Sequence, residues 1–104
     1  NGTAIASGND TSVMYFDYIG VYYNGVYDPF KGQIDEFAIW NSDQTSNLSA
    51  IYNSGLPADL ASLSPVNWWR MEEGAGTTVA DSGSAANNPL NLENGAGFST
   101  DVPL

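Results

Sequence analysis

The chain has 104 residues, a length that fits one domain with a modest hydrophobic core. It carries twelve acidic residues against Lys31 and Arg70, so its formal net charge at pH 7 is −10. Two cations cannot neutralise a row of phosphates, so the composition argues against binding to nucleic acid or to anionic membranes. The sequence contains neither cysteine nor histidine, which excludes disulfides, thiolate metal sites and the Ser-His and Cys-His hydrolases.

The sequence is rich in small polar residues and lacks an apolar stretch of the roughly 18 to 20 residues that a membrane span requires. It begins at Asn1 rather than at a methionine. We therefore expect a processed product or a piece of a longer polypeptide. A cysteine-free, acidic chain of this kind is expected on a virion or in an extracellular setting, without insertion into a membrane.

The first third of the chain carries aromatic and β-branched residues that favour strands. Asn24-Gly25 predicts a tight hairpin, because a type I′ turn needs a positive φ at both central positions, and Asp28-Pro29 ends this ribbon. Flat tyrosine rings suit stacking on sugars or burial in a protein interface, with some members filling the core. The tyrosines predicted to bind a glycan or a partner are Tyr15, Tyr18, Tyr22, Tyr23 and Tyr27.

Residues 33–40 give the strongest strand pattern of the chain. Apolar side chains fall on both faces of this strand, which predicts a central position in a sheet. The apolar period then changes to helical spacing at Leu48. It predicts one short helix near residues 45–54, which Thr45 can cap and Gly55 can end.

Residues 66–72 return to a strand pattern, and shorter patterns follow at 77–80 and 90–92 between turns rich in glycine and asparagine. The large tryptophan side chains are expected in the core rather than as platforms for a ligand; they are Trp40, Trp68 and Trp69. Short strands at even spacing are typical of a sandwich. We therefore predict an all-β fold, an antiparallel β-sandwich of the jelly-roll type with one short helix.

Residues 32–40 are similar to the G-x-I-D-E-x-x-I-W/Y strand of laminin-G-like domains in the concanavalin A-like superfamily. Residues 51–55 resemble the end of the short helix that follows this strand in the family. Residues 69–83 resemble the family's W-x-x-x-E-G-x-G-x-x-x-x-D-x-S/G signature. This resemblance implies a concanavalin A-like jelly roll that binds a partner or holds an assembly together.

The order of these motifs departs from the family, because the W-x-x-x-E-G segment commonly opens such a domain and here follows the I-D-E strand. Residues 1–104 are either one domain closed by a C-terminal strand, or the tail of one domain running into the head of the next. We expect the single domain, as the C-terminal part of a longer chain. Four stretches resemble the C-terminal region of structural proteins of marine tailed phages, at 51–55, 56–60, 64–71 and 98–103.

Adjacent carboxylates are the obvious candidates for acid–base chemistry. Asp35 and Glu36 are neighbours on a predicted strand, so they face opposite sides and cannot flank one glycosidic bond. Glu72-Glu73 diverges for the same reason, and we predict solvated loop acids there. We therefore predict no catalytic residue and no enzyme activity. Arg70 is instead expected to form a structural ion pair with Glu36 or with Asp35.

Calcium is the cation that the composition suits best, because oxygen ligands are plentiful and soft ligands are missing. The candidate ligands are Asp28 after the hairpin, and Asp81 and Asn87 in a polar loop. Ordinary turns stabilised by Asp and Asn side chains are the alternative interpretation of these residues.

The resemblance to phage proteins implies a non-catalytic structural or adhesion module of a virion, such as a fibre, decoration or tail-associated part. Its expected partners are other virion proteins or itself as a symmetric oligomer, since repeated weak contacts add up, with a cell-surface glycan as a further ligand. The alternative prediction is a calcium-dependent carbohydrate-binding module of a secreted bacterial protein.

Overall fold

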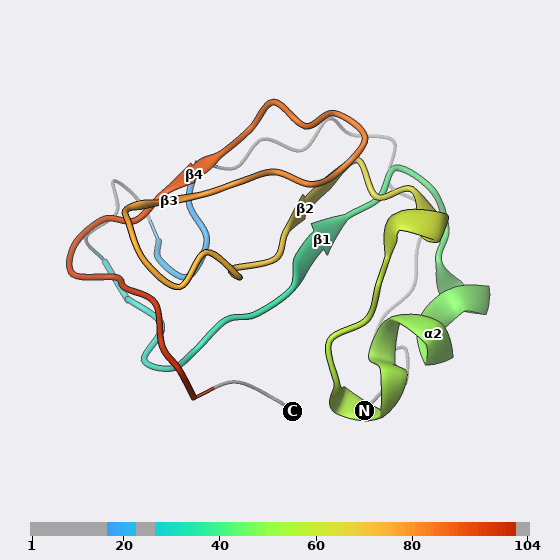
Figure 1. Cartoon of the computed structure of the whole chain (residues 1–104), viewed down its shortest axis with the longest axis horizontal. Helices are drawn as coiled ribbons and strands as arrows, with labels where there is room; N and C mark the ends of the chain where they lie inside the picture. The colour runs from blue at the N-terminus through green and yellow to red at the C-terminus, as the bar shows by residue number, and fades with distance from the viewer. Residues whose placement is uncertain (1–16, 23–26, 102–104) are drawn as a thin grey trace.

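The computed structural model describes residues 17–22 and 27–101, which contain short elements joined by long connections (Figure 1). In chain order these elements are β1 (Phe37–Ile39), η1 (Thr45–Asn47), α2 (Leu48–Tyr52), η2 (Asn53–Gly55), η3 (Ala61–Leu63), β2 (Asn67–Trp69), β3 (Thr78–Val79) and β4 (Leu90–Asn91). Within the described residues the strands form two antiparallel sheets of two strands, β1 with β2 and β3 with β4. No helix in this part of the chain is long and apolar enough to cross a membrane.

The prediction of a jelly-roll β-sandwich is wrong. The described ranges hold two 2-stranded sheets and one short α-helix, far fewer strands than the roughly eight of a jelly roll. Backbone conformation is the physical reason that the two main strands are short. Glu36, directly before β1, has a φ of 54°, and Met71, two residues after β2, has a φ of 57°. A residue with positive φ cannot continue an extended ladder.

The β2 strand lies at the centre of the described fold. On one side it pairs with β1, in a register that sets Phe37 opposite Trp69 and Ala38 opposite Trp68. On its other side the backbone N–H of Ser82 donates to the carbonyl of Trp68 at 2.7 Å, and Trp69 forms an isolated antiparallel bridge with Asp81. The 81–85 segment therefore lies along β2 like a third strand, although it forms no regular ladder.

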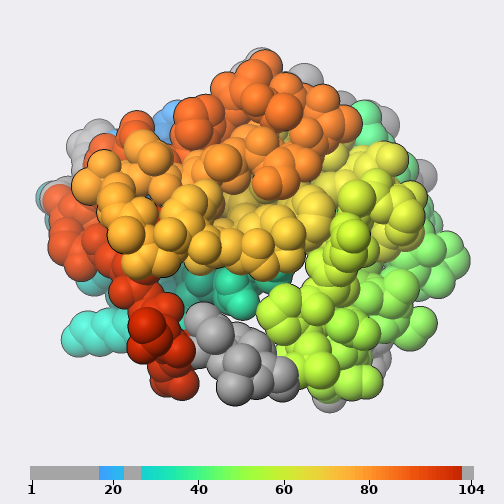
Figure 2. Space-filling model, in the orientation of Figure 1, coloured from blue at the N-terminus to red at the C-terminus, as the bar shows by residue number. Residues whose placement is uncertain are grey.

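The hydrophobic core is centred on the two tryptophans of β2. Trp68 and Trp69 are 4 % and 3 % exposed, and Leu60 and Val79 are buried with them. The ring of Phe37 lies 5.9 Å from that of Trp69, measured between centroids. The prediction that Trp68 and Trp69 belong to the core is confirmed. In Figure 2 the orange residues, which follow β2 in the chain, cover much of the upper part of the visible face.

The helical segment occupies residues 45–55, close to the predicted 45–54, but it is broken into three short pieces, η1, α2 and η2. Asn53 and Ser54 have φ values of 42° and 59°, so the α-helix ends at Tyr52, before the predicted stop at Gly55. The predicted cap by the Thr45 hydroxyl is wrong. Its hydroxyl and its backbone N–H both donate to a carboxylate oxygen of Asp43, at 2.6 and 2.8 Å.

The described residues include one backbone pair of the predicted hairpin. Tyr22 and Tyr27 pair through two backbone hydrogen bonds of 2.9 and 3.2 Å. The predicted turn at Asn24-Gly25 itself lies outside the described residues. Beyond this pair, the backbone N–H of Phe30 donates to the carbonyl of Gly20 at 2.8 Å. The 18–22 and 27–30 segments therefore run side by side.

Candidate functional sites

Large apolar side chains are exposed along the segment from residue 18 to residue 34. The exposed fractions are 70 % for Tyr22, 59 % for Tyr27 and Phe30, 40 % for Tyr18 and 39 % for Ile34. We call these five side chains the aromatic surface. Residues directly opposite in an antiparallel pair project to the same side, so the rings of Tyr22 and Tyr27 belong together. The other two predicted tyrosines, Tyr15 and Tyr23, lie outside the described residues.

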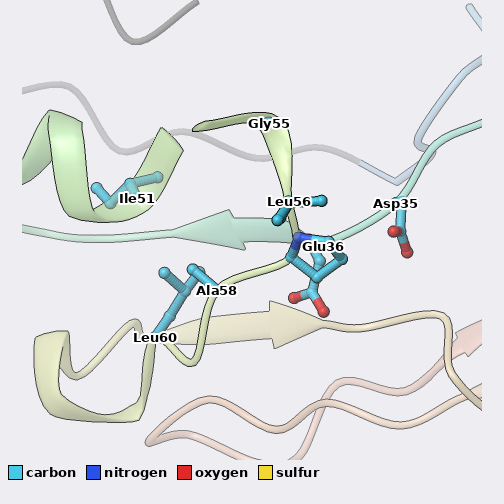
Figure 3. Close-up of a pocket in the computed structure, with 8 residues that line it drawn as sticks. Asp35, Glu36, Ile51, Gly55, Leu56, Ala58 and Leu60 are labelled. Atoms are coloured by element: carbon cyan, nitrogen blue, oxygen red, sulfur yellow. The ribbon is translucent and has the colours of Figure 1, made fainter. Parts of the chain in front are cut away.

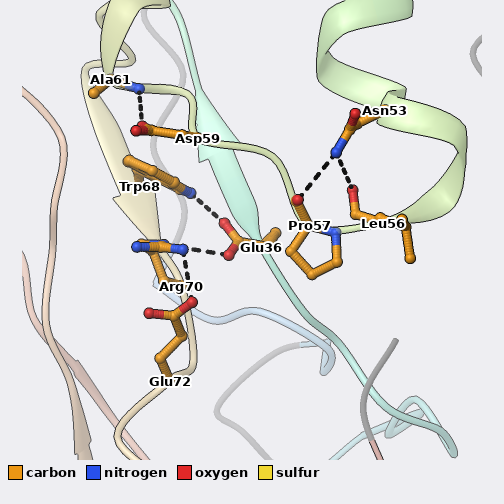
Figure 4. Close-up of polar contacts among 9 residues, drawn as sticks. All are labelled: Glu36, Asn53, Leu56, Pro57, Asp59, Ala61, Trp68, Arg70 and Glu72. Carbon is orange, nitrogen blue, oxygen red and sulfur yellow. Dashed lines mark hydrogen bonds and ion pairs between the residues drawn. The ribbon is translucent and has the colours of Figure 1, made fainter. Parts of the chain in front are cut away.

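The second cluster gathers around Glu36, at the end of the β1–β2 ladder. Glu36 and Arg70 are the next residues outward from the Phe37–Trp69 pair, and their side chains form an ion pair there. The Nε1–H of Trp68 donates to Glu36 Oε2 at 2.5 Å, and the Nε–H of Arg70 donates to Glu36 Oε1 at 3.3 Å (Figure 4). The guanidinium carbon of Arg70 lies 4.7 Å from the centre of the Trp68 ring, which adds a cation–π contact.

Arg70 had two expected carboxylate partners, and the structure pairs it with Glu36. Asp35 is exposed and forms no hydrogen bond or ion pair with another described residue. Sequence reasoning missed the second partner of Arg70: its Nη2 donates to Glu72 Oε1 at 2.6 Å. Alternation on a strand does not account for this contact, because Met71 between the two residues has a φ of 57° and interrupts the extended backbone.

The pKa of Glu36 lies above its ordinary value. Burial is the largest cause and raises the pKa, while the hydrogen bond from Trp68 and the charge of Arg70 lower it in part. Both carboxylate oxygens already accept a hydrogen bond from a structural group. Glu36 therefore links the start of β1 to β2 through these two hydrogen bonds.

Asp81 is a second buried carboxylate, and it ties the 81–85 segment to β2. Its Oδ1 accepts the backbone N–H groups of Trp68 at 3.0 Å and Gly83 at 2.9 Å, and its Oδ2 accepts the side-chain amide of Asn67 at 2.6 Å. Burial raises the pKa of Asp81, but the hydrogen bonds from Trp68, Asn67 and Gly83 outweigh it, so the pKa lies below its ordinary value.

The surroundings of Asp81 do not suit the calcium ion that its loop suggested. N–H groups point at its two oxygens, and a cation there would face donors of the same sign. Asp28 and Asn87, the other two candidates, are exposed. Among the described residues no group of three or more acidic side chains could hold a metal ion.

A small pocket of about 170 Å³ lies between the start of β1 and the connection that follows α2 (Figure 3). Its lining residues are Asp35, Glu36, Ile51, Gly55, Leu56, Pro57, Ala58 and Leu60. The wall is held in place by side-chain hydrogen bonds, because the amide of Asn53 donates to the carbonyl of Pro57 at 3.1 Å (Figure 4). Sequence reasoning missed this pocket, since its two halves are more than ten residues apart in the chain.

Comparison with known proteins returns no match for this chain. No family model matches it, and neither a curated protein nor a solved structure does. The resemblance in sequence and the surface chemistry of the described residues are therefore the two grounds on which a function can be proposed.

Proposed function

We propose that this chain is a non-catalytic structural or adhesion module of a phage virion, which works by contact with other virion proteins. The observation that carries this proposal is the aromatic surface. Five of the large hydrophobic side chains that are exposed in the described ranges lie between residues 18 and 34. We infer that these side chains form one patch. Contiguous exposed apolar patches mark interaction sites, and tyrosine is among the residues that contribute most to binding at interfaces.

The carboxylates support a binding role over a hydrolytic one. Asp35 and Glu36 are adjacent in the chain, and both oxygens of Glu36 are engaged by Trp68 and Arg70. The oxygens of Asp81 are engaged in the same way by backbone and amide groups. An acid–base pair for glycoside hydrolysis needs two carboxyl groups that face each other across the substrate.

The virion part of the proposal rests on the resemblance to structural proteins of tailed phages at residues 51–60, 64–71 and 98–103. A small module that repeats many times on a particle gains avidity from multiple contacts, so no single site needs high affinity. An exposed patch of modest size, rather than a deep pocket, fits that mode of action.

Carbohydrate binding is the second candidate, and one observation favours it. Tyr22 and Tyr27 pair across two backbone segments and are 70 % and 59 % exposed, which presents two flat rings to solvent. Aromatic rings of this kind suit stacking on the apolar face of a sugar. The donors around Asp81 give no support to a calcium-dependent form of this binding.

Tyrosine nitration footprinting tests the proposal. Virus particles purified from the source culture and the isolated chain are treated with the same nitrating reagent, and each tyrosine is quantified by peptide mass spectrometry. Tyr22 and Tyr27 are expected to react in the isolated chain and to be protected in the particle. Tyr52, which is 41 % exposed and outside the aromatic surface, is the matched control.

Two results would contradict the virion proposal: absence of the chain from purified particles, or equal nitration of Tyr22 and Tyr27 in both samples. A glycan array can identify an oligosaccharide that binds the isolated chain. If that oligosaccharide protects the same tyrosines from nitration without any particle, the result would favour the carbohydrate-binding candidate instead.

A further inference from the structure

Part of the aromatic surface is packed around Gly20. A β-carbon built on this glycine would lie 3.2 Å from the Cδ1 of Ile34 and 3.8 Å from the Cβ of Phe30, so both side chains border it. The backbone N–H of Phe30 also donates to the carbonyl of Gly20 at 2.8 Å. Two residues further along the chain, Tyr22 pairs with Tyr27. These contacts bring apolar side chains from two segments of the chain together, as the centre of a protein-binding patch requires.

Exposed carboxylates adjoin this surface. Asp17, Asp28 and Asp35 are each exposed and each directly adjacent in the chain to a member of the aromatic surface. Neighbouring α-carbons are about 3.8 Å apart, which is less than the Debye length of about 8 Å at physiological salt. One exposed cation, Lys31, lies in the same stretch, while Arg70 is held by two carboxylates elsewhere. The aromatic surface is therefore apolar at its centre and acidic at its edge.

This distribution of charge disfavours a second copy of the chain as the occupant of the surface. A two-fold dimer brings the same patch of both subunits together, so two acidic edges would meet. Like charges placed opposite each other across an interface cost free energy, whereas opposite charges speed up association and fix the register. Each copy also carries a net charge of −10, so two copies repel each other at long range. A basic edge around an apolar centre is the complement of this surface.

We propose that the aromatic surface binds a different protein, whose contact surface has apolar side chains at its centre and lysine or arginine side chains around them. The inference rests on the contact role proposed above for the aromatic surface, but not on its location in a virion. It narrows the partner to a basic protein surface and separates it from self-association.

Nuclear magnetic resonance titration of the isolated ¹⁵N-labelled chain tests the chemistry of this partner. The probe is a hexapeptide of alternating lysine and leucine with blocked ends (the lysine peptide), and its controls replace every lysine by glutamine or by glutamate. The lysine peptide is expected to shift the amide signals of Tyr22, Tyr27 and Phe30, with a dissociation constant on the order of 1 mM. The glutamine peptide should bind roughly three- to tenfold more weakly, and the glutamate peptide should leave these signals unshifted.

Salt separates the two parts of the interaction. A rise from about 0.02 M to about 0.5 M salt screens contacts between exposed charges and leaves apolar contacts in place. The lysine peptide should therefore lose its advantage over the glutamine peptide at high salt. An advantage that persists unchanged would show that charge at the edge of the surface does not select the partner.

Matched variants separate the surface from general attraction to an acidic chain. Asp28→Asn is expected to weaken the lysine peptide by about two- to fivefold, the range for an exposed ion pair, and to leave the glutamine peptide unchanged. Asp43→Asn removes the same charge from the connection between β1 and α2, which lies across the molecule from residues 17–22 (Figure 1), and should change neither peptide. Tyr22→Ser removes an exposed ring and should weaken both peptides. The spectra themselves show whether each variant remains folded.

Analytical ultracentrifugation tests the other half of the proposal. At about 0.15 M salt the isolated chain is expected not to pair through the aromatic surface, so Tyr22→Ser should leave its assembly state unchanged. A dimer of the original chain that Tyr22→Ser converts to a monomer would overturn the proposal in favour of a second copy.

Three results of the titration would also overturn the proposal. They are equal binding of the three peptides, equal effects of Asp28→Asn and Asp43→Asn, and binding of a neutral oligosaccharide at Tyr22 and Tyr27 when the lysine peptide leaves both signals unshifted. The titration uses the isolated chain, so it succeeds or fails independently of the footprinting on particles. Protection in the particle without any preference for the lysine peptide would keep the virion contact and remove only the basic partner.

Discussion

Two regions of the chain are rich in aromatic residues, and the structure treats them in opposite ways. Trp68 and Trp69 in β2 are almost fully buried, whereas Tyr22 and Tyr27 are more than half exposed. The β2 strand is covered on both edges, by β1 and by the 81–85 segment. Around Tyr22 the described residues contribute the pairing with Tyr27 and a backbone hydrogen bond from Phe30 to Gly20.

The indole nitrogens of the two buried tryptophans both have hydrogen-bond acceptors. The indole N–H of Trp68 donates to Glu36, and that of Trp69 donates to the carbonyl of Asn88 at 2.7 Å. Within the described residues no buried side-chain nitrogen or oxygen lacks a hydrogen-bond partner. Aromatic content alone therefore does not identify the core; among the described residues the buried aromatic rings are those of the two tryptophans in β2.

The largest difference between the two regions is expected for truncation of a core tryptophan. Trp69→Ala should destabilise the chain by about 3–5 kcal/mol, because it leaves a cavity and removes the contact with Phe37. Urea unfolding followed by circular dichroism measures this free energy. A loss below about 1 kcal/mol would show that β2 is not the centre of the core.

Removal of the Asp81 carboxylate is expected to have the next largest effect. Asp81→Ala leaves the N–H groups of Trp68 and Gly83 and the amide of Asn67 without their acceptor, at a cost of about 2–4 kcal/mol. The measurement is again urea unfolding at neutral pH. Asp81→Asn keeps one oxygen acceptor, so it serves as the milder comparison variant.

Asp81 also predicts a dependence on pH. Because its pKa is lowered in the folded chain, its contribution is present above the unfolded pKa of roughly 3.9 and is lost as the pH falls through the folded value. Glu36 has the opposite sign: its contribution is present below roughly 4.3 and is lost as the pH rises through its raised pKa. Asp81→Asn should therefore flatten the acid side of the stability profile, and an unchanged acid limb would contradict this.

A smaller loss is expected at Gly83. A β-carbon at this position would overlap the carbonyl oxygen of Val66 and the α-carbon of Asn67, both of them backbone atoms. Gly83→Ala should cost about 1–3 kcal/mol, because the 81–85 segment must move away from β2. Gly97→Ala is the matched control, since nothing lies within 4 Å of a β-carbon there. Equal stabilities of the two variants would argue against the close approach of these segments.

The Glu36–Arg70 pair should contribute less than these backbone contacts. Arg70→Met removes a partly exposed ion pair and a cation–π contact with Trp68, and we expect a loss of about 1 kcal/mol. It should also raise the pKa of Glu36 further, measurable by nuclear magnetic resonance. Lys31→Met removes the other cation of the chain from an exposed position and is the control. If both variants have the same stability, the pair has no structural role.

The smallest change in stability is expected on the aromatic surface itself. Tyr22→Ser removes a ring that is 70 % exposed, so unfolding should change by no more than about 0.5 kcal/mol. The same variant is expected to lose contact with the particle in a co-sedimentation assay. A large loss of stability would place Tyr22 in the fold rather than in an interface.

The sequence was sufficient to find the segments that pair, but not their lengths. Alternation of side chains located the strands that contain Phe37 and Trp69, and the two β2 tryptophans were expected in the core. Alternation does not report the sign of φ, and both Glu36 and Met71 adopt positive values that only glycine would have signalled. The ladders are therefore shorter than predicted, and the predicted sandwich is not formed.

Among the candidate sites, local composition suggested the exposed tyrosines but not the contacts made by tertiary packing. The exposure of Tyr18, Tyr22 and Tyr27 fits the use of these rings at a surface, which local composition suggested. Asp81 looked like a calcium ligand because its loop is rich in oxygen-bearing residues; the donors that occupy it come partly from β2, more than ten residues away. Contacts that depend on tertiary packing, such as those around the pocket beside Glu36, cannot be recognised from a local sequence pattern.

The left-handed residues at the end of the β1–β2 ladder also limit how another molecule can associate with this chain. Many peptides bind by adding a strand to an exposed sheet edge, which requires a long run of unpaired backbone groups. Here Glu36 lies directly before the three paired residues of β1 and Met71 lies two residues after those of β2, so the ladder stops at this end. The described sheet thus offers little template for strand addition, so recognition falls to side chains, and its specificity can be changed by surface substitutions that leave the backbone pairing untouched.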